Sequence, residues 1–144
     1  MSRYKRVLVA VDLTNEATEV VDQAVTICKD NNAELHIVHA IEPLSFAYGG
    51  DIPMDFSGIQ EEIQKQAHLK LSKTAQKYGI DEAHQHLVIG RPETEIHNLT
   101  NEHNIDLVVI GSHGRHGLAL LLGSTANGVL HGSQCDVLAV RVGE

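Results

Sequence analysis

The chain has no tryptophan and only three tyrosines and two phenylalanines among its 144 residues. Proteins that bind single-stranded nucleic acid commonly stack bases on aromatic side chains, so this composition argues against that role. Positive charge is also scarce, with 11 lysines and arginines against 19 aspartates and glutamates and a formal net charge of −8. A general nucleic-acid surface needs a net basic face, so we expect no nucleic-acid partner.

Long apolar runs and a cysteine framework are missing as well. The apolar run "VLVAV", which follows the basic residues near the N-terminus, is too short for the core of a signal peptide. No stretch approaches the length of a membrane span. The two cysteines, Cys28 and Cys135, each lie within an apolar pattern, which favours two reduced, buried thiols over a disulfide scaffold. We therefore expect a cytoplasmic protein with no membrane partner.

What the chain contains is a regular alternation of apolar runs and helical patterns, in a composition that is 42% hydrophobic and 21% charged. Continuous β-branched runs without alternation are typical of strands covered on both faces. Such runs predict five strands, at Arg6–Val11, Glu34–Ile41, His84–Ile89, Ile105–Ile110 and Asp136–Val142. A predicted helix separates each strand from the next, so we expect a single domain over residues 1–144, of the α/β class, with a doubly wound parallel sheet.

The helices are predicted from apolar spacing and from residues typical of helix ends. They begin after Thr14, after Ser57, at Pro92 and near Ser124. The second and longest helix is expected to end at Gly79 and to bury one stripe of side chains: Ile59, Ile63, Ala67, Leu71 and Ala75.

A glycine-rich segment, "GSHGRHGLALLLGST" at residues 111–125, follows the fourth predicted strand directly. Ligands of open α/β sheets bind beyond the carboxyl ends of the strands. Gly111 and Gly114 can present backbone N–H groups without side-chain obstruction. Gly123, Ser124 and Thr125 open a helix, whose N-terminus suits an anion. The segment is interpreted as two stretches of backbone that together bind phosphate groups. The alternative is a tight connection with no ligand.

Several other nucleotide and catalytic sites are excluded by their motifs. The first predicted strand ends in "DLTNEA", without the glycines of a dinucleotide fingerprint. The chain has no G-x-x-x-x-G-K-[ST], so the phosphate-binding lysine of P-loop enzymes is missing, and no G-x-S-x-G of an esterase. The third strand, followed by "GRP", lacks the acidic residue of a phosphoacceptor.

Ten histidines and a carboxylate at a strand end are candidate metal ligands. Zinc needs three or four converging ligands, and neither cysteine is near a histidine in sequence. His84 and His86 would share one strand face, whereas His36 and His39 would lie on opposite faces. We interpret the histidines as scattered surface side chains or packed imidazoles. Asp12 either approaches a ligand or caps the following helix.

Four blocks, "RVLVAVDLT", "HIVHAIEP", "GRPETEI" and "DLVVIGSHGRHGLALLLGSTANGVLHGSQCDVLAVR", together resemble the universal stress proteins over nearly the whole chain. The resemblance implies a Rossmann-like, adenine nucleotide alpha hydrolase-like fold with five parallel strands in the order 3-2-1-4-5 and helices on both faces. It also implies a homodimer through the last strand. Pairing of Val137–Val142 with its copy would cover a long apolar sheet edge.

Nucleotide-binding members of that family carry the signature G-x2-G-x9-G-[ST]. This chain has Gly111-x2-Gly114 and then eight residues, one fewer, before Gly123-Ser124. The resemblance implies an AMP or ATP site in which Ala10 lines the base pocket, Ala40 meets adenine through its main chain, and Asp12 lies near the ribose or a phosphate-bound Mg²⁺. The other residues expected at the nucleotide are Gly111, His113, Gly114, Arg115, Gly123, Ser124 and Thr125.

Three functions remain open at this point. The retained glycines favour an adenine-nucleotide-binding stress-response protein that is non-catalytic or at most hydrolyses ATP slowly. The second is a slow ATPase or phosphotransferase, in which Asp12 holds Mg²⁺ and His113 or Arg115 lies near the terminal phosphate. The third is a nucleotide-free dimeric interaction protein, in which the shortened loop closes the pocket.

Overall fold

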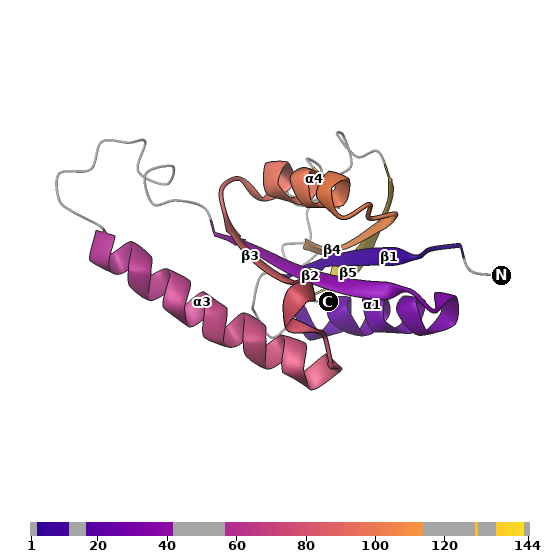
Figure 1. The fold of residues 1–144 in the computed structure, drawn as a ribbon, viewed down its shortest axis with the longest axis horizontal. Coiled ribbons are helices and arrows are strands. Elements are labelled where there is room, and N and C mark those ends of the chain that lie inside the picture. Colours follow the sequence, from indigo (N-terminus) through magenta and orange to yellow (C-terminus); the bar gives the residue numbers. More distant parts are fainter. Residues whose placement is uncertain (1–2, 12–16, 42–56, 114–128, 130–134, 143–144) are drawn as a thin grey trace.

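The computed structural model describes residues 3–11, 17–41, 57–113, 129 and 135–142. Within these residues one sheet contains five parallel strands (Figure 1). They are β1 (Arg6–Ala10), β2 (Glu34–Ile41), β3 (Gln85–Ile89), β4 (Leu107–His113) and β5 (Asp136–Val142). The strand order is β3-β2-β1-β4-β5, which confirms the order implied by the resemblance.

Helices cover both faces of the sheet, as predicted. Helices α1 (Ala17–Asn31) and α3 (Ser57–Tyr78) lie on one face and α4 (Pro92–Glu102) on the other (Figure 1). A short 3-10 helix, η1 (Glu82–His84), leads into β3. Val129 is helical and fully buried against the α4 face, and the rest of the helix predicted near Ser124 lies outside the described residues. None of the described helices is long and apolar enough to cross a membrane.

The alternation of side chains along the central strand divides the core into two layers. Val7 and Val9 face α1 and α3, whereas Leu8 faces α4. The cysteines divide in the same way: Cys28 is buried on the α1 face, and Cys135 packs on the α4 face. The thiols therefore lie on opposite sides of the sheet. Cys28 is buried as predicted, but Cys135 is only half-buried.

A residue with a left-handed backbone follows each of the three described α-helices within two positions of its end. These residues are Asn32 (φ 55°), Gly79 (φ 69°) and Asn104 (φ 54°). In each case the next residue donates its backbone N–H to the last turn of the helix, as Ile80 does to Ala75 over 2.9 Å. This pattern satisfies carbonyl groups that the helix leaves without partners. The predicted end at Gly79 is confirmed.

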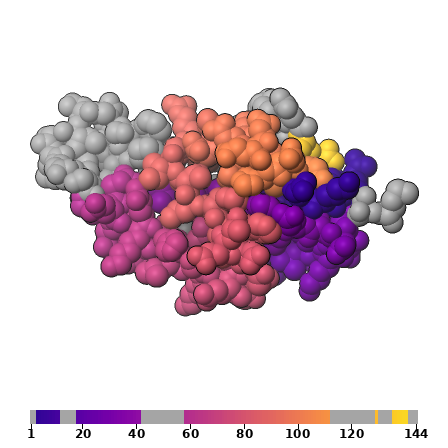
Figure 2. All heavy atoms as spheres, viewed as in Figure 1, coloured from indigo at the N-terminus to yellow at the C-terminus, as the bar shows by residue number. Residues whose placement is uncertain are grey.

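The buried stripe predicted for α3 is correct for only half of the helix. Ala67, Leu71 and Ala75 are buried, but Ile59 is 49% exposed and Ile63 is 37% exposed. The first turns of α3 extend beyond the strands (Figure 1), and in the space-filling view this helix forms the flank of the molecule (Figure 2). The spacing of apolar residues defines a helix face, but it does not say how far the sheet reaches beneath it.

Candidate functional site

The strand order reverses between β1 and β4, and this defines the place where a ligand would bind. From β1 the chain passes through α1 to β2 and then to β3 on one side, whereas α4 returns it to β4 on the other side of β1. β1 and β4 are direct neighbours, with Val9 opposite Val109. Connections leave the two strands in opposite directions, and in open α/β sheets of this kind ligands bind beyond the carboxyl ends of the strands.

Two of the predicted residues, Ala10 and Ala40, lie on neighbouring strands at this end of the sheet. Ala10 is the last residue of β1, and its register partner on β2 is Val38, two residues before Ala40. Ala10 packs on the α4 face, and the alternation from Val38 puts Ala40 on the same face. Both alanines are half-buried. Their side chains add little bulk at the ends of these two strands.

The beginning of the glycine-rich segment differs from the prediction. The fourth strand was expected to stop at Ile110, but β4 continues through Gly111 and Ser112 to His113. The extension is stabilised by pairing with β5, in which Gly111 lies opposite Val140 and His113 opposite Val142. Sequence reasoning missed it because the glycine and the polar residues in "GSH" indicate a loop.

The extension carries β4 beyond the end of β1. β1 ends at Ala10 and the described residues continue to Val11, whereas β4 runs two residues beyond the register position that Val11 would occupy. Successive residues of a strand point their backbone groups to opposite neighbours. Within the described residues, the β4 backbone at Ser112 and His113 therefore has a strand partner only on the β5 side.

His39 is a residue at this end that the sequence analysis did not assign. Its Nδ1 lies 2.8 Å from the carbonyl oxygen of Val11, and since a carbonyl only accepts, this nitrogen carries the proton. The backbone N–H of Val11 in turn donates to the carbonyl of Val38 over 2.9 Å. β2 thus holds both backbone groups of the residue that precedes Asp12. The prediction that His36 and His39 lie on opposite faces is consistent with their different partners.

The remaining residues of the predicted site lie outside the described part of the chain. These are Asp12, Gly114, Arg115, Gly123, Ser124 and Thr125, together with the side chain of His113. The described structure brings together Ala10, Ala40 and Gly111 from β1, β2 and β4. The placement of the other residues at a nucleotide, and of Mg²⁺ at Asp12, stays a prediction.

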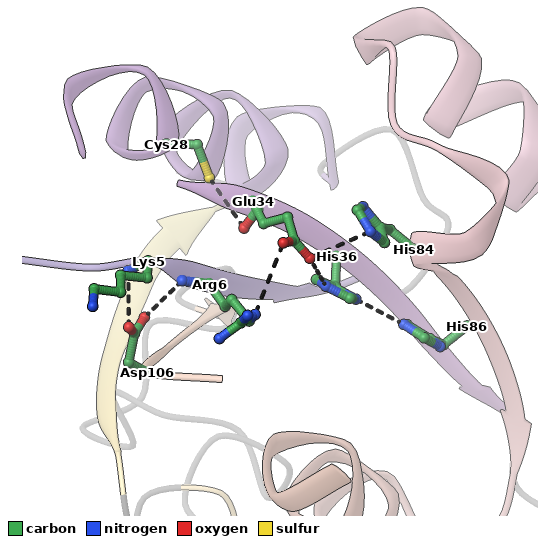
Figure 3. Close-up of polar contacts among 8 residues, drawn as sticks. All are labelled: Lys5, Arg6, Cys28, Glu34, His36, His84, His86 and Asp106. Carbon is green, nitrogen blue, oxygen red and sulfur yellow. Dashed lines mark hydrogen bonds and ion pairs between the residues drawn. The ribbon is translucent and has the colours of Figure 1, made fainter. Parts of the chain in front are cut away.

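A second polar cluster lies at the opposite end of the sheet, where β2 and β3 begin. Glu34 and His36 of β2 meet His84 and His86 from the η1–β3 segment (Figure 3). The imidazoles are packed, which was one of the two interpretations, but they are not scattered. Sequence spacing could not show this, because His36 and His86 are 50 positions apart and meet only through strand pairing.

The strand order and the helices on both faces define a doubly wound α/β protein. A family model described as the Universal stress protein family matches residues 3–141. The chain therefore belongs to the universal stress protein family. Universal stress protein A homolog 1 of Coxiella burnetii is 40% identical over 143 residues, which cover 98% of this chain and 99% of the relative.

Solved structures agree on the fold. The universal stress protein UspA from Lactobacillus plantarum aligns with a TM-score of 0.77 at 22% identity, over 98% of this chain and 100% of the other. A universal stress protein solved in complex with cAMP aligns with a TM-score of 0.61 at 25% identity, over 97% of this chain and 98% of that chain.

Proposed function

We propose that this universal stress protein binds an adenine nucleotide, AMP or ATP, at the carboxyl ends of β1, β2 and β4. In this proposal it acts in the stress response through the bound nucleotide and hydrolyses it slowly or not at all. The observation that carries the proposal is the extension of β4 through Gly111 beyond the end of β1, at the point where the strand order reverses. In this proposal the β4 backbone groups that have no strand partner among the described residues bind the nucleotide.

Three further observations support an adenine nucleotide. Ala10 and Ala40 offer main-chain groups and little side-chain bulk on the two strands beside the proposed site. The glycines and the Ser124–Thr125 pair that follow in the sequence supply phosphate donors at a predicted helix N-terminus. A family member of the same fold is a complex with cAMP, which is also an adenine nucleotide.

Calorimetric titration with ATP, ADP, AMP and cAMP, followed by an assay of phosphate release, tests the proposal. We expect heat with at least one nucleotide and little or no release of phosphate. Release that Asp12→Ala abolishes would replace the proposal with the slow ATPase or phosphotransferase. The absence of heat with every nucleotide would favour the nucleotide-free interaction protein.

A bulky substitution at the carboxyl end of β2 tests where the nucleotide binds. Ala40→Leu adds a branched side chain at the carboxyl end of β2, where we expect it to weaken nucleotide binding at least tenfold. Ala83→Leu is the matched control, because Ala83 is exposed in η1 near the opposite end of the sheet. Equal binding by the two variants would move the nucleotide away from Ala40.

We also propose a homodimer formed through β5. β5 is an edge of the described sheet, and its residues 137–140 are apolar and only half-buried. An apolar edge strand is stabilised against aggregation when it pairs with a copy of itself across a two-fold axis. Light scattering coupled to size exclusion should give twice the 15.7 kDa mass of the chain. A monomer at micromolar concentration would contradict the dimer.

A further inference from the structure

Four histidines and one glutamate gather where β2 and β3 begin, at the end of the sheet opposite the proposed nucleotide site. Glu34 is the first residue of β2, His36 follows on the same face, and His84 ends η1. His86 is the second residue of β3, and His103 caps the end of α4 above them. The ring centroids of His36 and His103 are 5.1 Å apart. The five side chains come from three parts of the chain.

One carboxylate oxygen joins two of the imidazoles. Oε1 of Glu34 lies 3.0 Å from Nε2 of His36 and 3.3 Å from Nε2 of His84 (Figure 3). The three ligand atoms all lie within 4.8 Å of one another. In a tetrahedral zinc site, bonds of about 2.0–2.2 Å separate neighbouring ligand atoms by about 3.3 Å. Two of the three separations, 3.0 and 3.3 Å, are close to this value, and the third pair, the two imidazole nitrogens, lies within 4.8 Å.

The second oxygen of Glu34 has a different neighbour. Oε2 lies 3.8 Å from Nε of Arg6, whose backbone N–H is held by Oδ1 of Asp106 over 3.1 Å. The guanidinium therefore partners the oxygen that is turned away from the histidines. This arrangement leaves Oε1 as a single-oxygen ligand of negative charge that is aimed at the two rings.

The ring of His36 is held from its other side by His86. Nδ1 of His36 lies 3.0 Å from Nε2 of His86, and His36 itself is only 3% exposed. Histidines that bind metals commonly use their second nitrogen in a hydrogen bond of this kind, which fixes the ring orientation.

We propose that Glu34, His36 and His84 form a binding site for zinc, with water in the fourth position. Two imidazoles and one carboxylate are a ligand set that zinc uses when one position stays open. Water can reach that position because the side chains of His84 and Glu34 are 26% and 43% exposed. The absence of a cysteine among the ligands favours a borderline metal over a soft one. The site is separate from the proposed nucleotide crevice.

Zinc binding requires a change of tautomer in two rings. Without metal, the carboxylate of Glu34 only accepts, so Nε2 of His36 carries a proton and Nδ1 of His36 accepts from Nε2 of His86. When zinc takes Nε2 of His36, the proton on that ring must be on Nδ1, which then donates to Nε2 of His86. The proton of His86 must then be on its own Nδ1. Each ring keeps one proton, so these two rings release none.

The experiment uses metal-free full-length protein without nucleotide. Zinc is titrated by calorimetry and cobalt by visible absorption, in the wild type and in two variants, His84→Ala and Glu34→Gln. We expect one ion per chain, tetrahedral cobalt absorption, and at least tenfold weaker binding in both variants. His68→Ala is the matched control, because His68 is an exposed histidine of α3 outside the cluster, and we expect its binding to be unchanged. Circular dichroism checks that each variant is folded.

Nitrogen NMR of the imidazoles gives a second measurement, because zinc bound elsewhere on the surface would not change the tautomer of His36. Zinc should move the proton of His36 from Nε2 to Nδ1, and the same change should follow in His86. The proposal is overturned if the wild type binds no zinc at micromolar concentration. It is also overturned if His84→Ala binds as tightly as the wild type, or if zinc binds without a change of tautomer in His36.

Discussion

Nδ1 of His39 donates a hydrogen bond of 2.8 Å to the carbonyl oxygen of Val11, and this bond joins the end of β1 to β2. Val11 is 8% exposed, so its carbonyl has little access to water as a substitute partner. We expect His39→Ala to lower the free energy of unfolding by about 1–3 kcal/mol, the cost of a buried polar group left without a partner. Urea denaturation measures this change.

His39→Asn separates the hydrogen bond from the loss of volume, because the amide nitrogen of asparagine can replace Nδ1. We expect this variant to recover most of the stability lost in His39→Ala. Equal losses of stability in the two variants would show that the hydrogen bond to Val11 does not contribute to stability.

Two leucines of α3, Leu71 and Leu69, allow a buried and an exposed side chain to be compared within one helix. Leu71 is 2% exposed and packs with Ala75 against the sheet, whereas Leu69 is 54% exposed. We expect Leu71→Ala to destabilise the fold by about 2–5 kcal/mol, through lost burial and the cavity left behind. Leu69→Ala should change stability by no more than about 0.5 kcal/mol. Similar midpoints in thermal unfolding would contradict the packing of α3 on the sheet.

Two glycines, Gly90 and Gly58, allow a strained backbone position to be compared with an unstrained one. Gly90 has a φ of 152°, a conformation that favours glycine, and a Cβ there would lie 2.6 Å from Oε2 of Glu95. Since that oxygen ends a flexible side chain, the backbone dominates, and Gly90→Ala should cost about 1–3 kcal/mol. At Gly58 of α3 no atom lies within 4 Å of the added Cβ, so Gly58→Ala should stabilise by about 0.5–1 kcal/mol. Chemical denaturation of both variants measures the difference.

Tyr78 links the end of α3 to α1 and gives the protein a response to alkaline pH. Its hydroxyl donates to Oδ1 of Asp22 over 2.7 Å, and burial, followed by this hydrogen bond, raises the pKa of Tyr78 to about 12. The folded state therefore keeps a proton that the unfolded chain loses near pH 10. The stabilising contribution is complete below pH 10 and is lost as the pH rises towards 12.

The variant Tyr78→Phe isolates this contribution. The wild type should lose stability more steeply than the variant between pH 10 and 12, as followed by urea midpoints. An absorbance titration should also lose one tyrosine step near pH 12. Parallel stability curves would show that Tyr78 ionises as freely in the folded protein as in the unfolded chain.

Features that depend on local sequence could be predicted, and those that depend on the meeting of distant residues could not. The end of α3 at Gly79 and the start of α4 at Pro92 follow from backbone preferences of single residues. The extension of β4 through "GSH" was missed because β5, and not the local sequence, stabilises it. The exposure of Ile59 was missed because it depends on where the sheet ends.

The candidate sites show the same division. Ala10, Ala40 and Gly111 could be assigned because the ends of parallel strands meet at one edge, so that position along the chain gives position in space. His36 and His84 come together through the register of β2 and β3, in which Ile37 lies opposite Gln85. A shift of one residue would turn one partner to the other face, and the composition of the two strands does not fix that register.

Alternate residues of β2 connect the two ends of the molecule. Glu34, His36, Val38 and Ala40 follow one another on a single face of the strand. The distance from Glu34 to Ala40 along the strand is about 20 Å, at about 3.3 Å per residue. One short rigid segment thus belongs to both the proposed cation site and the proposed adenine pocket. Thermodynamic reciprocity then requires that the factor by which zinc alters nucleotide affinity equals the factor by which nucleotide alters zinc affinity.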